Sequence, residues 1–393
     1  AVGGDTVQGG WAGPIDLRLR RDVFPFHPNI VTIMLGMNDA SYRPFDPQIF
    51  ARFQRGYEHI IASLQQHLPG VRIVLLETSP FDEVTQRPPF PGGYNGVLDR
   101  YDAFVRQLGR EHHLLVVDFN TPMVRVMREA ERINPKLAAD IIPGRVHPSA
   151  AGEMMMAEAL LRAWGAPATV TRVRLAADGA VAGAEGASIS HVAARAGGLS
   201  WTELDASLPM PVLGLHAKWP QFPKWEMYLP PQPQAGVTEP AAALIDRLSG
   251  FTRYLDQEPL AVTGLPAGNY RLAIDGQAVG TFDAQRLAAG INLAEYPTPM
   301  MRQAYQVSNL VWEQIAAHFV AWHDIQTSLG NFGVTWPGAK SAKLPVSTEN
   351  DPAAARAVTQ AMRAMRALDG AIEAREYQAN QPRPHRFTLT PVS

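Results

Sequence analysis

Hydrophobic residues recur with two different periods over the first 165 positions of the chain. Three short runs, residues 29–35, 72–76 and 114–119, are apolar, and such runs are typical of strands buried in a parallel sheet. Between them, apolar residues recur three or four positions apart in residues 46–68 and 96–112, which predicts helices. Strands separated by helices predict βαβ crossovers and a parallel sheet covered on both faces.

The helix predicted for residues 46–68 has recognisable ends. Asp46 is suited to cap its first turn, Pro47 fits the first helical position, and Pro69-Gly70 ends it. Two further helices are expected at residues 122–137 and 149–164.

The pattern changes after Trp164. Residues 169–176 and 187–194 alternate like half-exposed strands, and residues 209–234 have no sustained period, which predicts a long loop. Three short strands are expected within residues 260–282, with a hairpin turn at Asp275-Gly276. Later helices are expected at residues 240–255, 300–322 and 351–375. We therefore expect one α/β domain at residues 1–166 and a mixed α+β extension at residues 167–393.

Composition excludes several classes of protein. The 393 residues carry 35 Lys and Arg against 37 Asp and Glu, whereas a nucleic-acid-binding protein needs a basic surplus. The longest stretch without Asp, Glu, Lys, Arg or His has 15 residues, 325–339, and contains Gly and Pro, so no membrane span is expected. Without Cys, the chain has no disulfide, thiolate metal site or Cys nucleophile, and we expect neither a metal nor a cofactor.

Candidate chemistry begins at Gly36-Met37-Asn38-Asp39, directly after the first predicted strand. Ligands of parallel α/β sheets bind at the carboxyl ends of strands, and a side-chain amide there could donate a hydrogen bond to a developing oxyanion. An ordinary turn is the alternative, because Gly, Asn and Asp are common turn residues.

Two other motifs have the same ambiguity. His147 is followed by Pro148, which stiffens the backbone, and by Ser149, which could cap the next helix; a general base needs such fixed placement. The alternative is a plain surface histidine. Gly3-Gly4-Asp5-Thr6 could let a backbone N–H approach a ligand, or could be any glycine turn. The phosphate-loop pattern GxxxxGK[ST] does not occur.

Together and in this order, the three motifs resemble the SGNH (GDSL-type) hydrolase family over about residues 1–165. Gly4-Asp5-Thr6 matches the family's second block, Gly36-Met37-Asn38-Asp39 its third, and His147-Pro148 its fifth. The resemblance implies a flavodoxin-like three-layer α/β/α fold and a serine esterase. The remaining chain is similar to the long extension of some bacterial members.

The resemblance also implies roles for individual residues. The backbone N–H of Gly4 and the amide of Asn38 would form the oxyanion hole, and His147 would be the base in acyl transfer to water. Asp39 and Thr6 are expected to contact the substrate, which would be an acetylated carbohydrate or another small ester. The expected location is extracytoplasmic or secreted.

The sequence departs from the family at the nucleophile. The first block, Gly-Asp-Ser, does not occur, and Thr6 lies 32 positions before Asn38, the interval expected of the second block. We therefore expect this sequence to lack the protein's N-terminal strands and serine, and to be inactive by itself. In that case residues 31–35 should be hydrogen-bonded to another strand on one side only.

A second departure lies at Gly144. The family has Asp three residues before the catalytic histidine, where it orients the imidazole. Asp140, seven residues before His147, could replace it if the loop folds back.

Two functions remain open. Gly144 and the missing serine favour a non-catalytic relative that binds a ligand. The tryptophans of the extension (Trp201, Trp219, Trp225 and Trp336) could form a sugar platform, but such aromatics more often pack an extension onto its main domain. The joint presence of Asn38, Gly4 and His147 favours the ester hydrolase, which is the function we expect.

Overall fold

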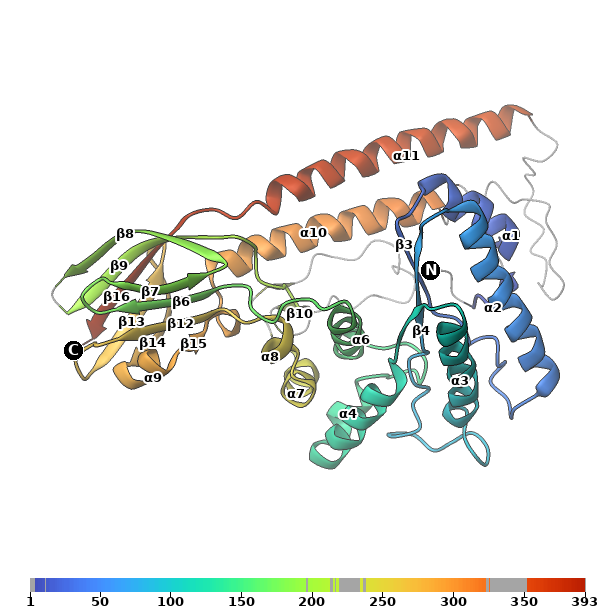
Figure 1. The fold of residues 1–393 in the computed structure, drawn as a ribbon, viewed down its shortest axis with the longest axis horizontal. Helices are drawn as coiled ribbons and strands as arrows, with labels where there is room; N and C mark the ends of the chain where they lie inside the picture. The colour runs from blue at the N-terminus through green and yellow to red at the C-terminus, as the bar shows by residue number, and fades with distance from the viewer. Residues whose placement is uncertain are drawn as a thin grey trace. The chain divides into compact units, whose positions relative to one another are not determined.

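The computed structural model describes residues 4–10, 12–195, 197–212, 215, 217–218, 234–235, 238–322, 325 and 352–392. The predicted loop at residues 209–234 lies mostly outside these residues, as do Trp219, Trp225 and Trp336. By internal contacts the chain divides into two units, residues 1–160 with 318–367 and residues 161–317 with 368–393 (Figure 1). The hydrophobic pattern predicted one division at residue 166 and gave no sign that later residues return to the first unit.

A parallel sheet is the centre of the first unit. Its strands are β3 (Ile30–Ile33), β4 (Arg72–Leu76) and β5 (Leu115–Val117), in the order β3-β4-β5. All residues of β4 after Arg72 are buried, so both faces of this strand are covered. The predicted α/β architecture is thereby confirmed. Within the described part of the chain β3 pairs only with β4, which confirms the predicted one-sided edge.

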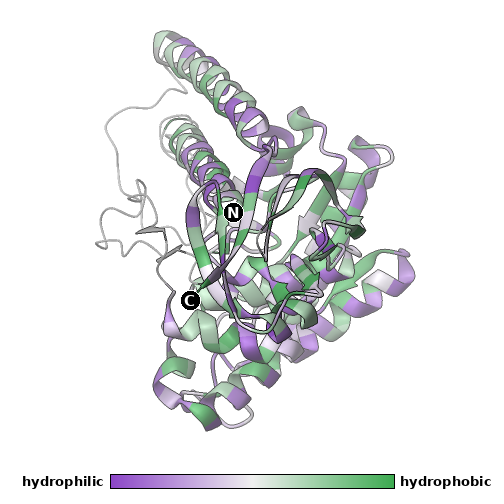
Figure 2. Ribbon diagram, turned by 90° about the vertical axis from the view of Figure 1, so that its left-hand side faces the viewer, coloured by the Kyte–Doolittle hydropathy of each residue, from purple (hydrophilic) through white to green (hydrophobic). Residues whose placement is uncertain are grey.

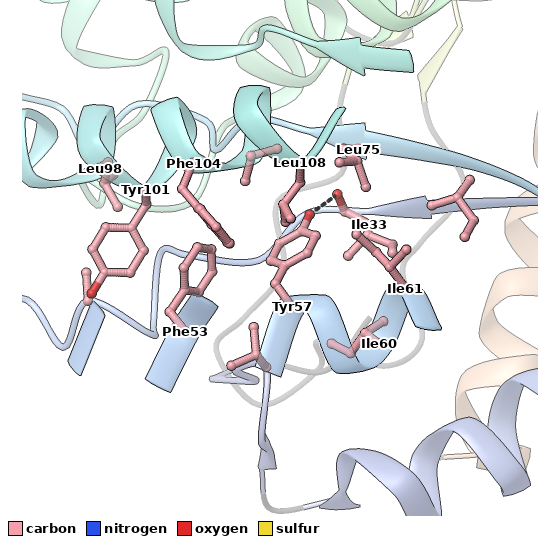
Figure 3. Packing of buried hydrophobic residues seen from close by; sticks show 14 of the residues in the cluster. Ile33, Phe53, Tyr57, Ile60, Ile61, Leu75, Leu98, Tyr101, Phe104 and Leu108 are labelled. Carbon is pink, nitrogen blue, oxygen red and sulfur yellow. Dashed lines mark hydrogen bonds between the residues drawn. The ribbon is translucent and has the colours of Figure 1, made fainter. Parts of the chain in front are cut away.

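Helices α2 (Pro47–His67) and α3 (Asn95–Glu111) share one hydrophobic core with the sheet. Figure 3 shows Phe53 and Tyr57 of α2 pointing toward α3, where Tyr101 lies with its ring centroid 4.6 Å from that of Phe53. The hydroxyl of Tyr57 donates a 3.1 Å hydrogen bond to the carbonyl of Ile33 in β3. The predicted cap is also present, because Asp46 accepts hydrogen bonds from two backbone N–H groups of the first turn of α2.

The other elements of the first unit are mostly short. They are β1 (Gly9–Gly10), β2 (Gly13–Pro14), α1 (Ile15–Arg18), η1 (Leu19–Val23), η2 (Phe24–Phe26), α4 (Asn120–Ile133), α5 (Pro135–Ala139) and α6 (Ala150–Ala163). The single helix predicted for residues 122–137 is wrong. Asn134 is extended between α4 and α5, because a residue before proline disfavours helical geometry, and its side chain caps α5.

The second unit contains two sheets that bury one common core. One sheet has the order β15 (Ile291–Asn292), β12 (Pro259–Thr263), β6 (Arg172–Ala176), β7 (Val181–Glu185). The other has the order β14 (Gln277–Asp283), β13 (Asn269–Ile274), β16 (His385–Val392), β9 (Gly198–Asp205), β8 (Ala187–Arg195). Trp201 of β9 is buried and its ring stacks on Phe387 of β16. Trp201 therefore packs the core and is not available as a sugar platform.

The predicted turns and strands of this unit are largely confirmed. Asp275 and Gly276 have φ angles of 51° and 78° and connect β13 to β14, as the hairpin pattern requires. The three strands expected within residues 260–282 are present, but β12 lies in the other sheet. Strand β16 was not predicted.

Helices complete the second unit. They are α7 (Pro240–Ser249), α8 (Phe251–Leu255), α9 (Ala284–Ala289), η3 (Leu293–Glu295) and most of α10 (Pro299–Phe319), besides a short strand pair, β10 (Ala217–Lys218) and β11 (Gln234–Ala235). The last long helix, α11 (Pro352–Ala379), is divided between the units, with residues 352–367 in the first and 368–379 in the second. Residues 240–255 were predicted as one helix and form two, because Gly250 at φ 87° ends α7. Hydrophilic and hydrophobic positions are interleaved along the long helices (Figure 2). None of the helices in the described ranges has the length and hydropathy needed to cross a bilayer.

Candidate active site

Two segments far apart in the sequence are joined by one carboxylate, that of Asp39. Its Oδ1 accepts a 2.9 Å hydrogen bond from the backbone N–H of Val7, and its Oδ2 accepts one of 2.9 Å from the N–H of Gly36. Asp39 is buried, and burial raises the pKa of its carboxyl to about 6, against the lowering effect of these two hydrogen bonds. The turn at residues 4–9 is thus fixed to the carboxyl end of β3.

Asn38, the residue before Asp39, also contacts the turn at residues 4–9, where the predicted oxyanion hole lies. Its Nδ2 donates a 3.2 Å hydrogen bond to the carbonyl of Asp5, the residue after Gly4. Gly4 has φ 78° and is exposed, and no atom would lie within 4 Å of a Cβ built on it. The side-chain amide of Asn38 and the backbone next to Gly4 are therefore neighbours, with open space beside the glycine.

Gly36 is required by the tight turn that carries Asn38. Its φ is 133°, a conformation that side chains disfavour, and an added Cβ would lie 3.0 Å from Cγ2 of Thr78. The N–H of Ala40 then donates to the carbonyl of Gly36 at 3.1 Å, which turns the chain sharply after β3. Asn38 is presented at the strand end by this turn.

Thr6 and Asp39, the two expected substrate contacts, both have internal partners. The Thr6 hydroxyl donates to the carbonyl of Gly9 at 2.8 Å and accepts from the N–H of Gln8 at 3.2 Å. Both oxygens of Asp39 are occupied as described above. The structure gives each side chain a part in shaping the loops, and contact with a substrate stays a prediction.

His147 lies exposed on a short loop whose backbone is held on both sides. The carbonyl of Arg145 accepts a 2.9 Å hydrogen bond from the N–H of Asp82, and the N–H of Ser149 donates one of 2.9 Å to the carbonyl of Ile141. The predicted capping bond of Ser149 is not formed, because its Oγ is buried without a hydrogen-bond partner. The backbone anchors, rather than a side-chain cap, fix this loop.

Aromatic side chains connect the Asn38 turn with the His147 loop. The guanidinium of Arg145 lies 5.5 Å from the ring centroid of Phe81. The Phe81 ring in turn contacts Tyr94, at 5.1 Å between centroids, and Tyr42, at 6.2 Å. Tyr94 donates a hydrogen bond to the carbonyl of Met37, and Tyr42 donates one to Asn38. One cluster therefore contacts both loops.

Asn38 is hydrogen-bonded to the residue after Gly4, whereas the link from His147 to this pair is less direct. Across the described ranges no hydrogen bond links His147 to Asn38 or Gly4, and neither a hydrogen bond nor an ion pair links it to Asp140. Asp140 is exposed after the last turn of α5. The replacement of the missing acid by Asp140 therefore stays a prediction.

The sequence did not single out Tyr42, Phe81 or Tyr94. Only Tyr42 lies near the motif at residues 36–39 in sequence, and for all three residues aromatic character is explained equally well by core packing. Their contacts with Met37 and Asn38 depend on the fold. Among the described side chains no group of three His, Asp or Glu is placed to hold a metal ion.

Comparison with known proteins finds relatives of the first 154 residues. Residues 1–154 match the sequence profile of the GDSL-like Lipase/Acylhydrolase family, which confirms the resemblance drawn from the three motifs. An acetylxylan esterase of Geobacillus stearothermophilus is 29% identical over 168 residues, which are 42% of this chain and 69% of the relative.

Two solved structures are similar to this chain to different extents. A gut microbial diltiazem-metabolizing enzyme has 25% sequence identity and a TM-score of 0.76, and the match covers 99% of this chain and 88% of that one. The likeness extends over the residues of both units. The crystal structure of an acetylxylan esterase from Geobacillus stearothermophilus matches 41% of this chain and 68% of that chain, with 27% identity and a TM-score of 0.31.

Proposed function

We propose that this protein is a carboxylic-ester hydrolase that deacylates acetylated carbohydrates or other small esters. The premise is that residues 1–154 carry a domain of the GDSL-like lipase/acylhydrolase family. One observation carries the proposal: the amide of Asn38 is bonded at 3.2 Å to the carbonyl of Asp5, in a turn that Asp39 fixes to β3. In this proposal, Nδ2 of Asn38 and the N–H of Gly4 are the two donors to one carbonyl oxygen.

The reaction would be acyl transfer in two steps. His147 accepts the proton of a serine hydroxyl as its oxygen attacks the ester carbonyl, and the negative charge develops on the carbonyl oxygen. Nδ2 of Asn38 and the N–H of Gly4 donate hydrogen bonds to that oxygen, and His147 returns the proton to the leaving alcohol. Water then releases the acid by the same steps. One oxyanion donor typically contributes on the order of 10²–10³ in kcat.

The substrate class is supported by the named activity of the acetylxylan esterase relative and by one feature of the site. Tyr42, beside Asn38, is 44% exposed, and an exposed aromatic side chain suits packing against a sugar. A polysaccharide substrate would also place the protein outside the cytoplasm, because a polymer of that kind does not cross a bilayer unaided. Cell fractionation followed by immunoblotting tests this location.

A non-catalytic binding protein is the second candidate, supported by two observations. Gly144 stands where the family has an acid, and His147 is exposed with no hydrogen bond to a described carboxylate. Such a protein would bind the ester and release it unchanged.

Hydrolysis of p-nitrophenyl acetate and of acetylated xylan separates the two candidates. Since no Gly-Asp-Ser occurs in these 393 residues, the assay uses the protein translated from its own start codon. Asn38→Ala should lower kcat by on the order of 10²–10³, and His147→Ala by about 10⁴. His59→Ala, at an exposed histidine paired with Asp16, is the matched control and should leave kcat unchanged. Undiminished turnover by His147→Ala would remove this histidine from the mechanism.

A further inference from the structure

We propose that Tyr42 is a positioning residue for Asn38, whose hydroxyl holds the side-chain amide with Nδ2 toward the oxyanion position. The hydroxyl donates a 2.9 Å hydrogen bond to Oδ1 of Asn38. The proposal rests on the proposed function, since it requires Asn38 to be an oxyanion donor.

The orientation of the Asn38 carboxamide decides whether its NH₂ group or its oxygen faces the reacting carbonyl. Rotation by 180° exchanges the NH₂ and the oxygen of Asn38, and an oxygen turned toward the reacting carbonyl would repel the developing negative charge. The carbonyl of Asp5 is only an acceptor, so its 3.2 Å contact with Asn38 requires the NH₂ on that side. Oδ1 then points to the other side, where the Tyr42 hydroxyl satisfies it.

A substrate would change these contacts unequally. Nδ2 of Asn38 has two hydrogens and can donate to the oxyanion as well as to the carbonyl of Asp5, whereas Oδ1 keeps its bond from Tyr42. The bond from Tyr42 therefore keeps the Asn38 amide oriented while its NH₂ group donates to the oxyanion. Donation to Oδ1 also polarises the amide and strengthens its N–H groups as donors.

The backbone supports this reading. Ser41 and Tyr42 have φ angles of 61° and 52°, so two consecutive residues other than glycine are in the left-handed region. Such conformations are rare and cluster at functional sites. The N–H of Ser41 donates to the carbonyl of Asn38 at 3.0 Å, which closes the turn and brings Tyr42 back over the amide.

Neighbouring rings fix the hydroxyl of Tyr42 further. Its ring stacks on Tyr94 with centroids 5.0 Å apart and planes 24° apart, and it contacts Phe81. Tyr94 is fully buried and donates a hydrogen bond to the carbonyl of Met37. The hydroxyls of Tyr94 and Tyr42 therefore bind two consecutive residues, Met37 and Asn38. Partial burial raises the pKa of Tyr42 above its ordinary value, so its hydroxyl keeps its proton at neutral pH.

The test is a double-mutant cycle of Tyr42→Phe and Asn38→Ala, with kcat and KM for p-nitrophenyl acetate measured on the protein translated from its own start codon. Tyr42→Phe keeps the ring and removes the hydroxyl, so kcat should fall by about tenfold, as expected for one hydrogen bond, with KM unchanged. In the Asn38→Ala background the same change should have no effect. Tyr42→His, which keeps a ring N–H donor, should recover part of kcat. Tyr377→Phe, at an exposed tyrosine of α11, is the control and should match the parent.

The outcomes separate this proposal from the proposed function. An unchanged kcat in Tyr42→Phe, or an equal loss with and without Asn38, overturns the positioning role while the esterase proposal stands. Full activity of Asn38→Ala would instead overturn the oxyanion role itself. If Tyr42→Phe does not fold, as judged by its circular dichroism and melting temperature, Tyr42→Leu, which also lacks a donor, carries the same cycle.

Discussion

The backbone N–H of Val7 donates a 2.9 Å hydrogen bond to Oδ1 of Asp39, a residue 32 positions later in the chain. The second oxygen of the same carboxylate accepts from Gly36. Motifs that are separate in sequence are thus joined through one buried side chain. The relative positions of Gly4 and Asn38 depend on this carboxylate.

Asp39→Ala should therefore lower both stability and activity. The substitution leaves two N–H groups without their partner, and each unsatisfied buried group costs about 1–3 kcal/mol. We expect the free energy of unfolding, measured with urea, to fall by about 2–4 kcal/mol, with a parallel loss of kcat as the turn at residues 4–9 detaches. Asp16→Ala, at an exposed carboxylate, is the control and should cost less than about 1 kcal/mol. Equal effects of the two substitutions would contradict the bridging role.

Gly56→Ala should be destabilising although alanine is the better helix former. Gly56 lies within α2, and an added methyl would be 2.7 Å from Cβ of Val7, so the turn carrying Gly4 would have to move. Overpacking of this kind typically costs about 1–3 kcal/mol.

The matched control for this substitution is Gly370→Ala in α11. No atom lies within 4 Å of the added methyl there, so only the helix propensity changes. Thermal unfolding should show Gly370→Ala stabilised by up to about 1 kcal/mol and Gly56→Ala destabilised. An increased melting temperature of Gly56→Ala would show that the turn at residues 4–9 can move without loss of stability.

Gly144→Asp should raise the activity of the protein translated from its own start codon. Gly144 does not have a positive φ and no atom would lie within 4 Å of its Cβ, so a side chain fits. A carboxylate three residues before His147 would orient the imidazole and stabilise its charged form, and loss of such an acid costs on the order of 10⁴ in kcat. We expect a gain of about tenfold or more in kcat for p-nitrophenyl acetate.

Gly144→Asn separates charge from size in that experiment. Its side chain has the same shape as that of aspartate but cannot stabilise an imidazolium, so kcat should stay near the parent value. Equal gains from both substitutions would show that the effect does not arise from an acid at this position.

Among the described residues of the second unit, four carboxyl groups are buried. Glu203 and Asp205 lie on β9, and Asp256 and Glu258 precede β12; Glu258 is 1% exposed and neither of its carboxyl oxygens has a hydrogen-bond partner. Burial raises the pKa of Glu203 to about 8, of Asp205 to about 6 and of Asp256 to about 7. The pKa of Glu258 is raised in the same way, by burial first and then by the other three acids.

These raised pKa values predict that stability falls with increasing pH. Between the unfolded pKa near 4 and the folded values of about 6 to 8, the folded state binds more protons, so the free energy of unfolding declines as pH rises through this window. The melting temperature should be higher at pH 5 than at pH 8. Glu258→Gln removes one titrating group, and its advantage over the parent should grow from pH 5 to pH 8. A melting temperature that rises over this range would contradict the assignment.

Local sequence determined the elements whose residues interact with near neighbours. The periodicity of residues 46–68 was sufficient for α2, because its apolar residues recur on one face and Asp46 caps it within one turn. The hairpin at Asp275-Gly276 follows for the same reason, since the turn requires two positive φ angles. The order of the three motifs at residues 4–6, 36–39 and 147–148 was likewise sufficient to recognise the family.

Tertiary structure alone decided the pairings between distant segments. Strand β16 lies between β13 and β9, over 100 residues from β13 in sequence, because its Phe387 and Leu389 complete a core supplied by other strands. The bond from Tyr42 to Asn38 is close in sequence but depends on two left-handed residues that packing on Tyr94 and Phe81 stabilises. The hydrophobic period predicts which face of a helix or strand is buried, but it does not predict which other element packs against that face. That choice depends on the free energy of the whole core.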